Sequence, residues 1–172
     1  TYGHYVWRTA THNNHVYMCG RRTRDFAEVA TLTERANLLQ SKILASQDGK
    51  RFLPVGTFQE KEGDETAFMF DELGRITAIS RRGRDKAELI TLSADFQITS
   101  RQELDRYIGG PFIGRFGDHT LVAGRNISGG ESKLVICTLV DGKLRTLCDL
   151  PSGGDCSYPS MIQLCPGCVL VS

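Results

Sequence analysis

The sequence repeats one pattern four times: an apolar segment, a tight turn and a second apolar segment. The turns contain Asn13-Asn14, Leu73-Gly74, Gly117-Asp118 and Pro166-Gly167. Each turn uses residues that tolerate a positive φ angle or fix a bend, as short β-hairpins require. The paired segments are residues 5–10 with 16–21, 66–70 with 76–81, 112–116 with 120–125, and 158–164 with 168–172. The repeat therefore predicts four β-hairpins in series.

A second hairpin is predicted after each of the first three. Its strands are residues 42–46 with 51–55, 88–93 with 96–99, and 133–139 with 143–147. Two hairpins per repeat give four strands, and successive first turns lie 60, 44 and 49 residues apart, which suits the blades of a β-propeller. We therefore expect an all-β fold, an incomplete β-propeller of about three and a half four-stranded blades. The expected blades cover residues 4–60, 64–104, 110–150 and 155–172 of a single domain spanning residues 1–172.

One segment, residues 23–41, departs from the repeat. Its apolar residues fall near helical spacing, which predicts a short inserted helix; they are Phe26, Val29, Leu32, Ala36 and Leu39. A helix-rich α+β domain is the structural alternative. The chain begins at Thr1 and ends at Ser172 inside predicted strands. We therefore expect it to be a piece of a longer propeller.

The composition excludes several classes of partner. The 172 residues carry a net charge of +1, which gives no bias toward nucleic acid or anionic membranes. No segment approaches the roughly 20 apolar residues that span a bilayer. Of six cysteines, only Cys165 and Cys168 form a close pair, and a zinc site needs a second pair or histidines at matching spacing. We predict no metal, no other cofactor, and neither a nucleic acid nor a membrane partner.

Two stretches resemble proteins of the sialidase superfamily. Residues 46–52, Ser-Gln-Asp-Gly-Lys-Arg-Phe, are similar to a shortened Asp-box, the family's structural turn, and residues 93–95 are similar to a weaker copy. Residues 152–159, Ser-Gly-Gly-Asp-Cys-Ser-Tyr-Pro, resemble the Gly-Asp-x-Ser-Tyr-Pro-Gly segment of bacterial sialidase-like propellers. The resemblance covers most of the chain and is closest over residues 110–160. It implies the C-terminal half of a retaining glycoside hydrolase that binds an acidic sugar, in a protein for which a secreted or periplasmic location is favoured.

The resemblance also implies roles for single residues. Sialidases use a tyrosine nucleophile, a glutamate that activates it, a separate acid and three arginines that bind the substrate carboxylate. By motif, Tyr158 matches the nucleophile and Glu65 the activating glutamate. Arg81 and Arg125 match the second and third arginines. The first arginine and the separate acid belong to earlier blades, so the 172 residues alone are expected to be inactive.

Aligning the repeats on their turns brings together an overlapping set of residues. Nine positions before the turn stand Tyr5, Glu65, Gly109 and Tyr158, and seven positions after it stand Arg21, Arg81 and Arg125. In an antiparallel hairpin these two positions are neighbours at the same end. A propeller gathers its inner strands around one channel, so the side chains should meet at one rim. The predicted site therefore has Tyr158 and Glu65 as catalytic residues, and as substrate-binding residues Arg81, Arg125, Asp155, Arg21 and Tyr5.

Simpler interpretations of these residues stay open. The repeated arginines could pair only with acids between blades, Tyr158 could be a packing residue, and Glu65 could belong to a solvated acidic loop. Two other functions also stay open. One is a non-catalytic propeller that binds glycan or protein, and the other is a propeller lyase or isomerase that acts on uronic-acid sugars.

Overall fold

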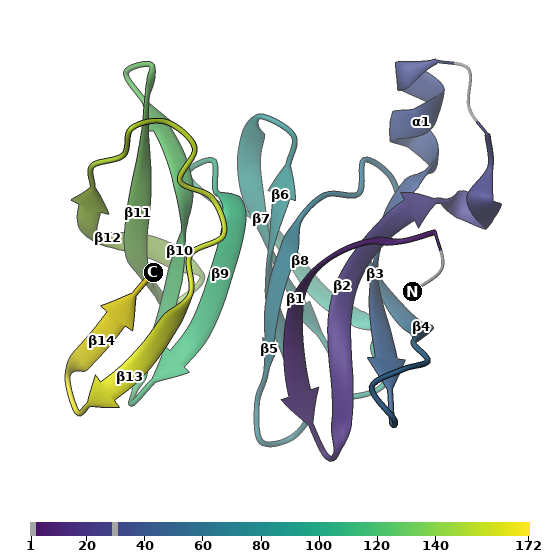
Figure 1. The fold of residues 1–172 in the computed structure, drawn as a ribbon, viewed down its shortest axis with the longest axis horizontal. Coiled ribbons are helices and arrows are strands. Elements are labelled where there is room, and N and C mark those ends of the chain that lie inside the picture. The colour runs from purple at the N-terminus through teal and green to yellow at the C-terminus, as the bar shows by residue number, and fades with distance from the viewer. Residues whose placement is uncertain (1–2, 29–30) are drawn as a thin grey trace.

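The computed structural model describes residues 3–28 and 31–172, and their fold is all-β (Figure 1). Strands make up 61% of the chain and helices 6%, which excludes the helix-rich alternative. Three four-stranded antiparallel sheets and one two-stranded hairpin follow one another along the chain. Within each sheet, every strand pairs with the next one in sequence.

The strand boundaries follow the predicted hairpins. The first sheet contains β1 (Tyr5–His12), β2 (His15–Thr23), β3 (Leu39–Ser46) and β4 (Leu53–Gln59). The second contains β5 (Thr66–Phe70), β6 (Ile76–Arg82), β7 (Asp85–Leu92) and β8 (Ile98–Glu103). The third contains β9 (Gly109–Phe116), β10 (His119–Ser128), β11 (Glu131–Val140) and β12 (Lys143–Leu150). The last hairpin is β13 (Met161–Cys165) with β14 (Cys168–Val171).

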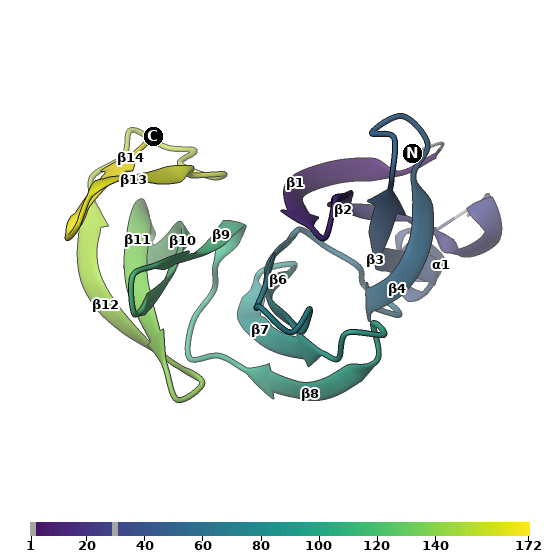
Figure 2. The same ribbon diagram turned by 90° about the horizontal axis from the view of Figure 1, so that it is seen from below.

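The first strand of each sheet lies innermost. β1 contacts β5, and β5 contacts β9, although each pair belongs to different sheets. Seen from below, the sheets stand around a common region with their first strands turned toward it and β4, β8 and β12 outside (Figure 2). This is the arrangement of propeller blades. The predicted fold class, an incomplete propeller of about three and a half blades, is confirmed.

Neighbouring sheets bury one another's apolar faces. One core cluster joins the first and second sheets and includes Ile43, Phe58 and Phe68, all 5% exposed or less. Another joins the second and third sheets and includes Ile79 and Val122, both fully buried. The apolar face of such a sheet is buried only when a neighbouring sheet packs against it, so the core forms only when the sheets assemble.

The inserted segment forms a helix, as predicted. A 3₁₀ turn η1 (Arg24–Phe26) precedes α1 (Leu32–Leu38). Thr31 and Glu34 form a capping box, in which the Thr31 hydroxyl accepts from the Glu34 amide at 3.2 Å. No residue of α1 is buried, so the helix stands outside the sheets (Figure 1). Val29, part of the predicted apolar stripe, lies outside the described residues.

The fourth hairpin begins later than predicted. We expected its first strand from residue 158, but β13 starts at Met161. Tyr158 has a φ angle of 63°, in the left-handed region, and its amide donates to the Gly110 carbonyl at 3.0 Å. Pro159 follows and has no N–H to give to a strand partner. The predicted strand start is therefore wrong, because Tyr158 is held against the third sheet before the hairpin begins. No helix among the described residues is long and apolar enough to cross a membrane.

Candidate active site

Strand register places the aligned residues at one end of the sheets. Tyr5 pairs with Arg21, and Gly109 pairs with Arg125. In the second sheet the Arg81 amide donates to the Glu65 carbonyl at 2.8 Å. The hairpin alignment therefore gave the correct neighbours in three repeats, and Tyr158 reaches the same end through the Gly110 carbonyl.

Glu65 lies at the centre of the cluster, immediately before β5. Its side chain is 8% exposed. Oε1 accepts from the Tyr158 hydroxyl at 2.6 Å and from Arg81 Nη1 at 3.0 Å, while Oε2 accepts from the Gly110 amide at 2.8 Å. Both carboxylate oxygens of a buried acid are thus hydrogen-bonded, which is what a stable buried charge needs.

These contacts set the protonation states of the pair. Burial raises the pKa of Glu65, but the Tyr158 hydroxyl, the Gly110 amide and Arg81 together outweigh it, and the pKa lies below its usual range. Burial and the bond to Glu65 raise the pKa of Tyr158 to about 12, while the Trp7 indole acts in the opposite direction. At neutral pH the site therefore holds an ionised glutamate and a neutral tyrosine.

Two arginines share Asp64, the residue before Glu65. Asp64 Oδ2 lies 3.5 Å from Arg81 Nε and accepts from the Gly83 amide at 2.9 Å. Asp64 Oδ1 lies 3.4 Å from Arg21 Nη1. The Arg21 guanidinium also lies 5.7 Å from the centre of the Tyr5 ring, within reach of a cation–π contact. Arg21 and Tyr5 therefore join the cluster through Asp64 rather than by touching Glu65.

Arg125 forms a second, more open group. Its Nη1 donates to Asp155 Oδ1 at 2.9 Å and its Nη2 to the Tyr107 hydroxyl at 3.2 Å. The Asp155 side chain is 75% exposed, whereas that of Arg125 is 21% exposed. Tyr107 connects the two groups, since the Arg81 guanidinium lies 5.6 Å from the centre of its ring. All seven predicted site residues are thus linked through contacts at one rim.

Tyr107 was missed by sequence reasoning, although the repeat held a signal. The aligned position of the third repeat is Gly109, which has no side chain. A Cβ atom at Gly109 would lie 2.3 Å from the Tyr107 hydroxyl oxygen. Tyr107 therefore fills the space that a side chain at the aligned position would take. A glycine in a position otherwise held by tyrosine or glutamate indicates that another residue enters there.

Arg8, on β1, was also missed. Its Nε donates to the Pro111 carbonyl at 2.8 Å and its Nη2 to the Pro159 carbonyl at 2.6 Å. It therefore ties the first sheet to the third sheet and to the residue after Tyr158. A cavity of about 620 Å³ lies beside these contacts, and its lining includes Trp7, Arg8, Phe68, Phe112, Tyr158 and Met161. This cavity gives the Tyr158 ring an accessible side, in agreement with its 47% exposure.

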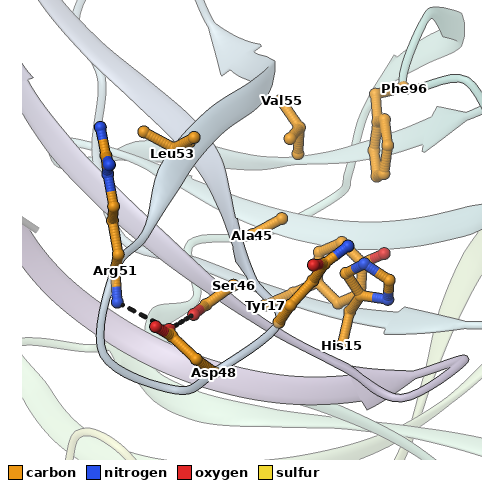
Figure 3. A pocket seen from close by; sticks show the side chains of 10 residues that line it. His15, Tyr17, Ala45, Ser46, Asp48, Arg51, Leu53, Val55 and Phe96 are labelled. Carbon is orange, nitrogen blue, oxygen red and sulfur yellow. Dashed lines mark hydrogen bonds between the residues drawn. The ribbon is translucent and has the colours of Figure 1, made fainter.

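Figure 3 shows a second pocket, of about 560 Å³. Its residue His15 pairs with His12 at the turn of the first hairpin, at the end of the sheet opposite the Tyr5–Arg21 pair. The lining of this pocket includes His15, Tyr17 and Phe96, and the pocket borders the turn after β3. In that turn Asp48 Oδ1 accepts from the Ser46 hydroxyl at 3.0 Å and from the amides of Lys50 and Arg51 at 2.8 and 2.9 Å. These bonds lower the pKa of Asp48 to about 2. Asp48 thus caps two backbone amides of its own turn.

The weaker copy of that turn is built differently. In residues 93–95 the Ser93 hydroxyl, rather than Asp95, accepts from a backbone amide, that of Gln97 at 3.2 Å. The Asp95 carboxylate accepts a hydrogen bond from the Ser93 hydroxyl. Neither turn contains a predicted site residue, so the second pocket is separate from the tyrosine and glutamate.

Comparison with known proteins gives matches of structure. No family model matches the chain, and no curated protein matches it. Among solved structures, the GH43 protein BlXynB from Bacillus licheniformis aligns with a TM-score of 0.59 and 14% identity over 83% of this chain and 30% of its own. A bifunctional GH43-CE protein from Bacteroides eggerthii aligns with a TM-score of 0.57 and 15% identity over 85% of this chain and 20% of its own length.

A protein from Bacteroides ovatus also aligns, with a TM-score of 0.54 and 11% identity. It is covered over 50% of its length, and it covers 92% of this chain. The chain therefore spans half or less of each of these structures. Likeness at such low identity concerns the fold, and it shows that the chain folds as part of a β-propeller of the kind found in GH43 proteins.

Proposed function

We propose that the chain carries the tyrosine and glutamate of a sialidase-like retaining glycoside hydrolase, with Tyr158 as nucleophile and Glu65 as the base that activates it. The observation that supports this most is the 2.6 Å hydrogen bond from the Tyr158 hydroxyl to Glu65 Oε1. The two residues are 93 positions apart, so the fold itself brings them together. The likeness to GH43 propellers supports a glycoside-hydrolase-like propeller in general, and the motif around Tyr158 supports the sialidase type.

The protonation states suit this role. A neutral tyrosine does not repel an anionic sugar, as a carboxylate nucleophile would. Because the pKa of Tyr158 is about 12 and that of Glu65 is below its usual range, proton transfer is unfavourable in the resting pair. The proton must therefore move from Tyr158 Oη to Glu65 Oε1 as the Oη–carbon bond forms and the glycosidic bond breaks. The leaving alcohol takes its proton from the separate acid that the resemblance assigns to the earlier blades. Water then gives a proton back to that acid as it attacks the same carbon, the Oη–carbon bond breaks, and Tyr158 Oη recovers its proton from Glu65.

Arg125 is the arginine best placed to bind a substrate carboxylate. Arg21 and Arg81 pair with Asp64 and Glu65, which are both buried. The partner of Arg125 is Asp155, which is 75% exposed and therefore easily displaced by water or by another carboxylate. A planar guanidinium can hold both oxygens of the incoming group. We infer an acidic sugar as substrate, with Asp155 free to accept from a sugar hydroxyl once displaced.

A second function is favoured by one observation. Each of the three predicted arginines already has a carboxylate partner within the chain. A propeller that binds glycan or protein without cleaving it would need no more than this. The choice between the two rests on whether Tyr158 takes part in turnover.

Tyr158→Phe in the full-length protein, with the earlier blades that the resemblance implies, should abolish hydrolysis while leaving binding intact. Removing a nucleophile should lower kcat by at least about 10³-fold, because no other group takes its place at Glu65. The measurement is turnover of a panel of acidic and neutral aryl glycosides, with affinity for the uncleaved sugar measured by calorimetry. Tyr17→Phe is the matched control, since Tyr17 lies in the pocket at the opposite end. Turnover retained in Tyr158→Phe would contradict the nucleophile assignment, and binding without turnover in the unaltered protein would favour the binding propeller.

Arg125→Ala should mainly weaken binding. If Arg125 pairs with a desolvated substrate carboxylate, the loss should be about 2–5 kcal/mol in binding free energy. The matching sugar without the carboxylate should bind the two proteins equally. An equal loss for both sugars would show that Arg125 supports the structure of the site and does not select an acidic sugar.

A further inference from the structure

Gly110 contacts both members of the Tyr158–Glu65 pair through its backbone. Its amide donates to Glu65 Oε2 at 2.8 Å, and its carbonyl accepts from the Tyr158 amide at 3.0 Å. The same peptide segment thus fixes the carboxylate from one side and the tyrosine backbone from the other. With Oε2 held by Gly110, Oε1 is the oxygen that faces the Tyr158 hydroxyl.

The position requires a glycine for two separate reasons. Its φ angle is 52°, in the left-handed region that other residues rarely adopt. A Cβ atom there would also lie 2.5 Å from the Tyr158 nitrogen and 2.6 Å from the Ser157 Cβ. The first of these neighbours is backbone, so a substituted residue would push the Tyr158 segment away from the third sheet.

The next residue along each segment is held by the same side chain. Arg8 donates to the carbonyls of Pro111 and Pro159, which follow Gly110 and Tyr158. Arg8 is partly buried, and this burial lowers its pKa. The two segments are thus joined at adjacent positions, once by backbone and once through a guanidinium. This leaves the Tyr158 segment little freedom to move relative to Gly110.

We propose that Gly110 is a positioning residue that sets the distance between nucleophile and base. The proposal rests on the proposed function of Tyr158 and Glu65, and it adds the part of the chain that holds them in reacting geometry. Gly110 does not touch the substrate in this proposal. The absence of a side chain at Gly110 lets the Tyr158 segment approach the third sheet. A side chain there would separate Tyr158 Oη from Glu65 Oε1 while both residues remain present.

The test compares Gly110→Ala with Gly117→Ala in the same full-length protein as above. Gly117 belongs to the same hairpin and has a φ angle of 57°, but none of the described atoms lies within 4 Å of the Cβ that would be added there. Both variants carry the same backbone penalty, and only the first displaces Tyr158. We expect kcat to fall by about 10²-fold in Gly110→Ala, as for a small misplacement of reacting groups, with KM little changed. Gly117→Ala should keep kcat within about twofold of the unaltered protein.

A spectroscopic readout separates the proposal from the proposed function. The ionisation of Tyr158 is followed by ultraviolet titration, as the difference between each protein and the same protein carrying Tyr158→Phe. In the unaltered protein and in Gly117→Ala the Tyr158 phenol should ionise near pH 12. In Gly110→Ala it should ionise closer to the ordinary value of about 10, because the bond to Glu65 is lost. An unchanged titration in Gly110→Ala would overturn the proposal, whatever the activity.

A second measurement needs no substitution at position 110. The amide resonance of Gly110 in the unaltered protein should move with pH as Glu65 titrates, below the usual glutamate range. It should also move in Tyr158→Phe, because Glu65 loses a donor there. A Gly110 amide resonance that shifts neither with pH nor in Tyr158→Phe would overturn the proposal even if Gly110→Ala fails to fold. If the resonance responds but Tyr158→Phe retains turnover, the positioning contact stands and the proposed function fails.

Discussion

Two carboxylates, Asp48 and Glu65, reach a similar state by different routes. Each accepts three hydrogen bonds, and each has a pKa below its usual range. The donors to Asp48 are two or three residues away in sequence. The donors to Glu65 are 16, 45 and 93 residues away. Asp48 is exposed at a turn, whereas Glu65 is buried at the opposite end of the sheets.

The difference separates a structural acid from a candidate catalytic one. Asp48 is satisfied by its own turn, so it would have the same bonds in any protein with that turn. Glu65 gains its partners only when the second and third sheets and the Tyr158 segment are in place. Hydrogen bonds alone therefore do not mark a functional carboxylate. A hydrogen bond from a tyrosine hydroxyl in a distant segment is a better indication of a candidate catalytic carboxylate.

Among the substitutions that test this comparison, Glu65→Gln has the largest expected effect. An amide cannot take a proton from Tyr158, so turnover should fall by about 10²–10⁴-fold, as for the loss of a general base. Kinetics on the best substrate of the glycoside panel measure this, with Asp48→Asn as the matched acid-to-amide control. Equal losses in the two variants would remove the distinction between the two carboxylates.

An intermediate effect is expected from Arg8→Gln. Two hydrogen bonds from a partly buried guanidinium to the carbonyls of Pro111 and Pro159 are lost, so the free energy of unfolding should fall by about 1.5–3 kcal/mol. Arg51→Gln, beside the Asp48 turn, is the control and should change it by no more than about 0.5 kcal/mol. Urea unfolding followed by fluorescence of the single tryptophan gives both values. If Arg51→Gln lowers the free energy of unfolding as much as Arg8→Gln does, long-range contacts stabilise the Tyr158 end no more than local contacts stabilise the Asp48 end.

The smallest expected effect is a pH-dependent one at Asp48. Its folded pKa of about 2 lies below the unfolded value of about 3.9, so its stabilising contribution is complete above about pH 5 and is lost progressively as pH falls through 2. Asp48→Asn should therefore lower Tm slightly at pH 6, and this difference should shrink at pH 3. Calorimetric melting at the two pH values checks it. A difference that does not change with pH would show that the ionised state of Asp48 contributes nothing.

The sequence predicted what lies within a repeat better than what lies between repeats. The turns, the strand pairs and the neighbours Tyr5–Arg21 and Glu65–Arg81 follow from aligning hairpins. The Asp48 turn was also predictable, because all its donors are local. The roles of the site residues and the limits of the domain stay predictions.

The contacts that sequence reasoning missed all run between segments. Arg8 bonds carbonyl groups, which every residue has, so its partners leave no mark in the sequence. Tyr107 lies two residues before the aligned Gly109 in the sequence, and its side chain fills the space that a side chain at Gly109 would take. Tyr158 leaves the strand pattern because Gly110 holds its amide, which no periodicity of residues 158–164 could reveal. Packing between sheets decided each of these.

The bond from Arg8 to the Pro159 carbonyl has a consequence for biosynthesis. The two residues are 151 positions apart. At a ribosomal rate of about 5–20 residues per second, Arg8 leaves the ribosome roughly 8–30 s before its acceptor. In the later part of that interval Arg8 can reach the Pro111 carbonyl, but the Pro159 carbonyl and the Tyr158 segment are still missing. A nascent chain paused between these two points therefore lacks the contact that joins the first sheet to the residue after Tyr158.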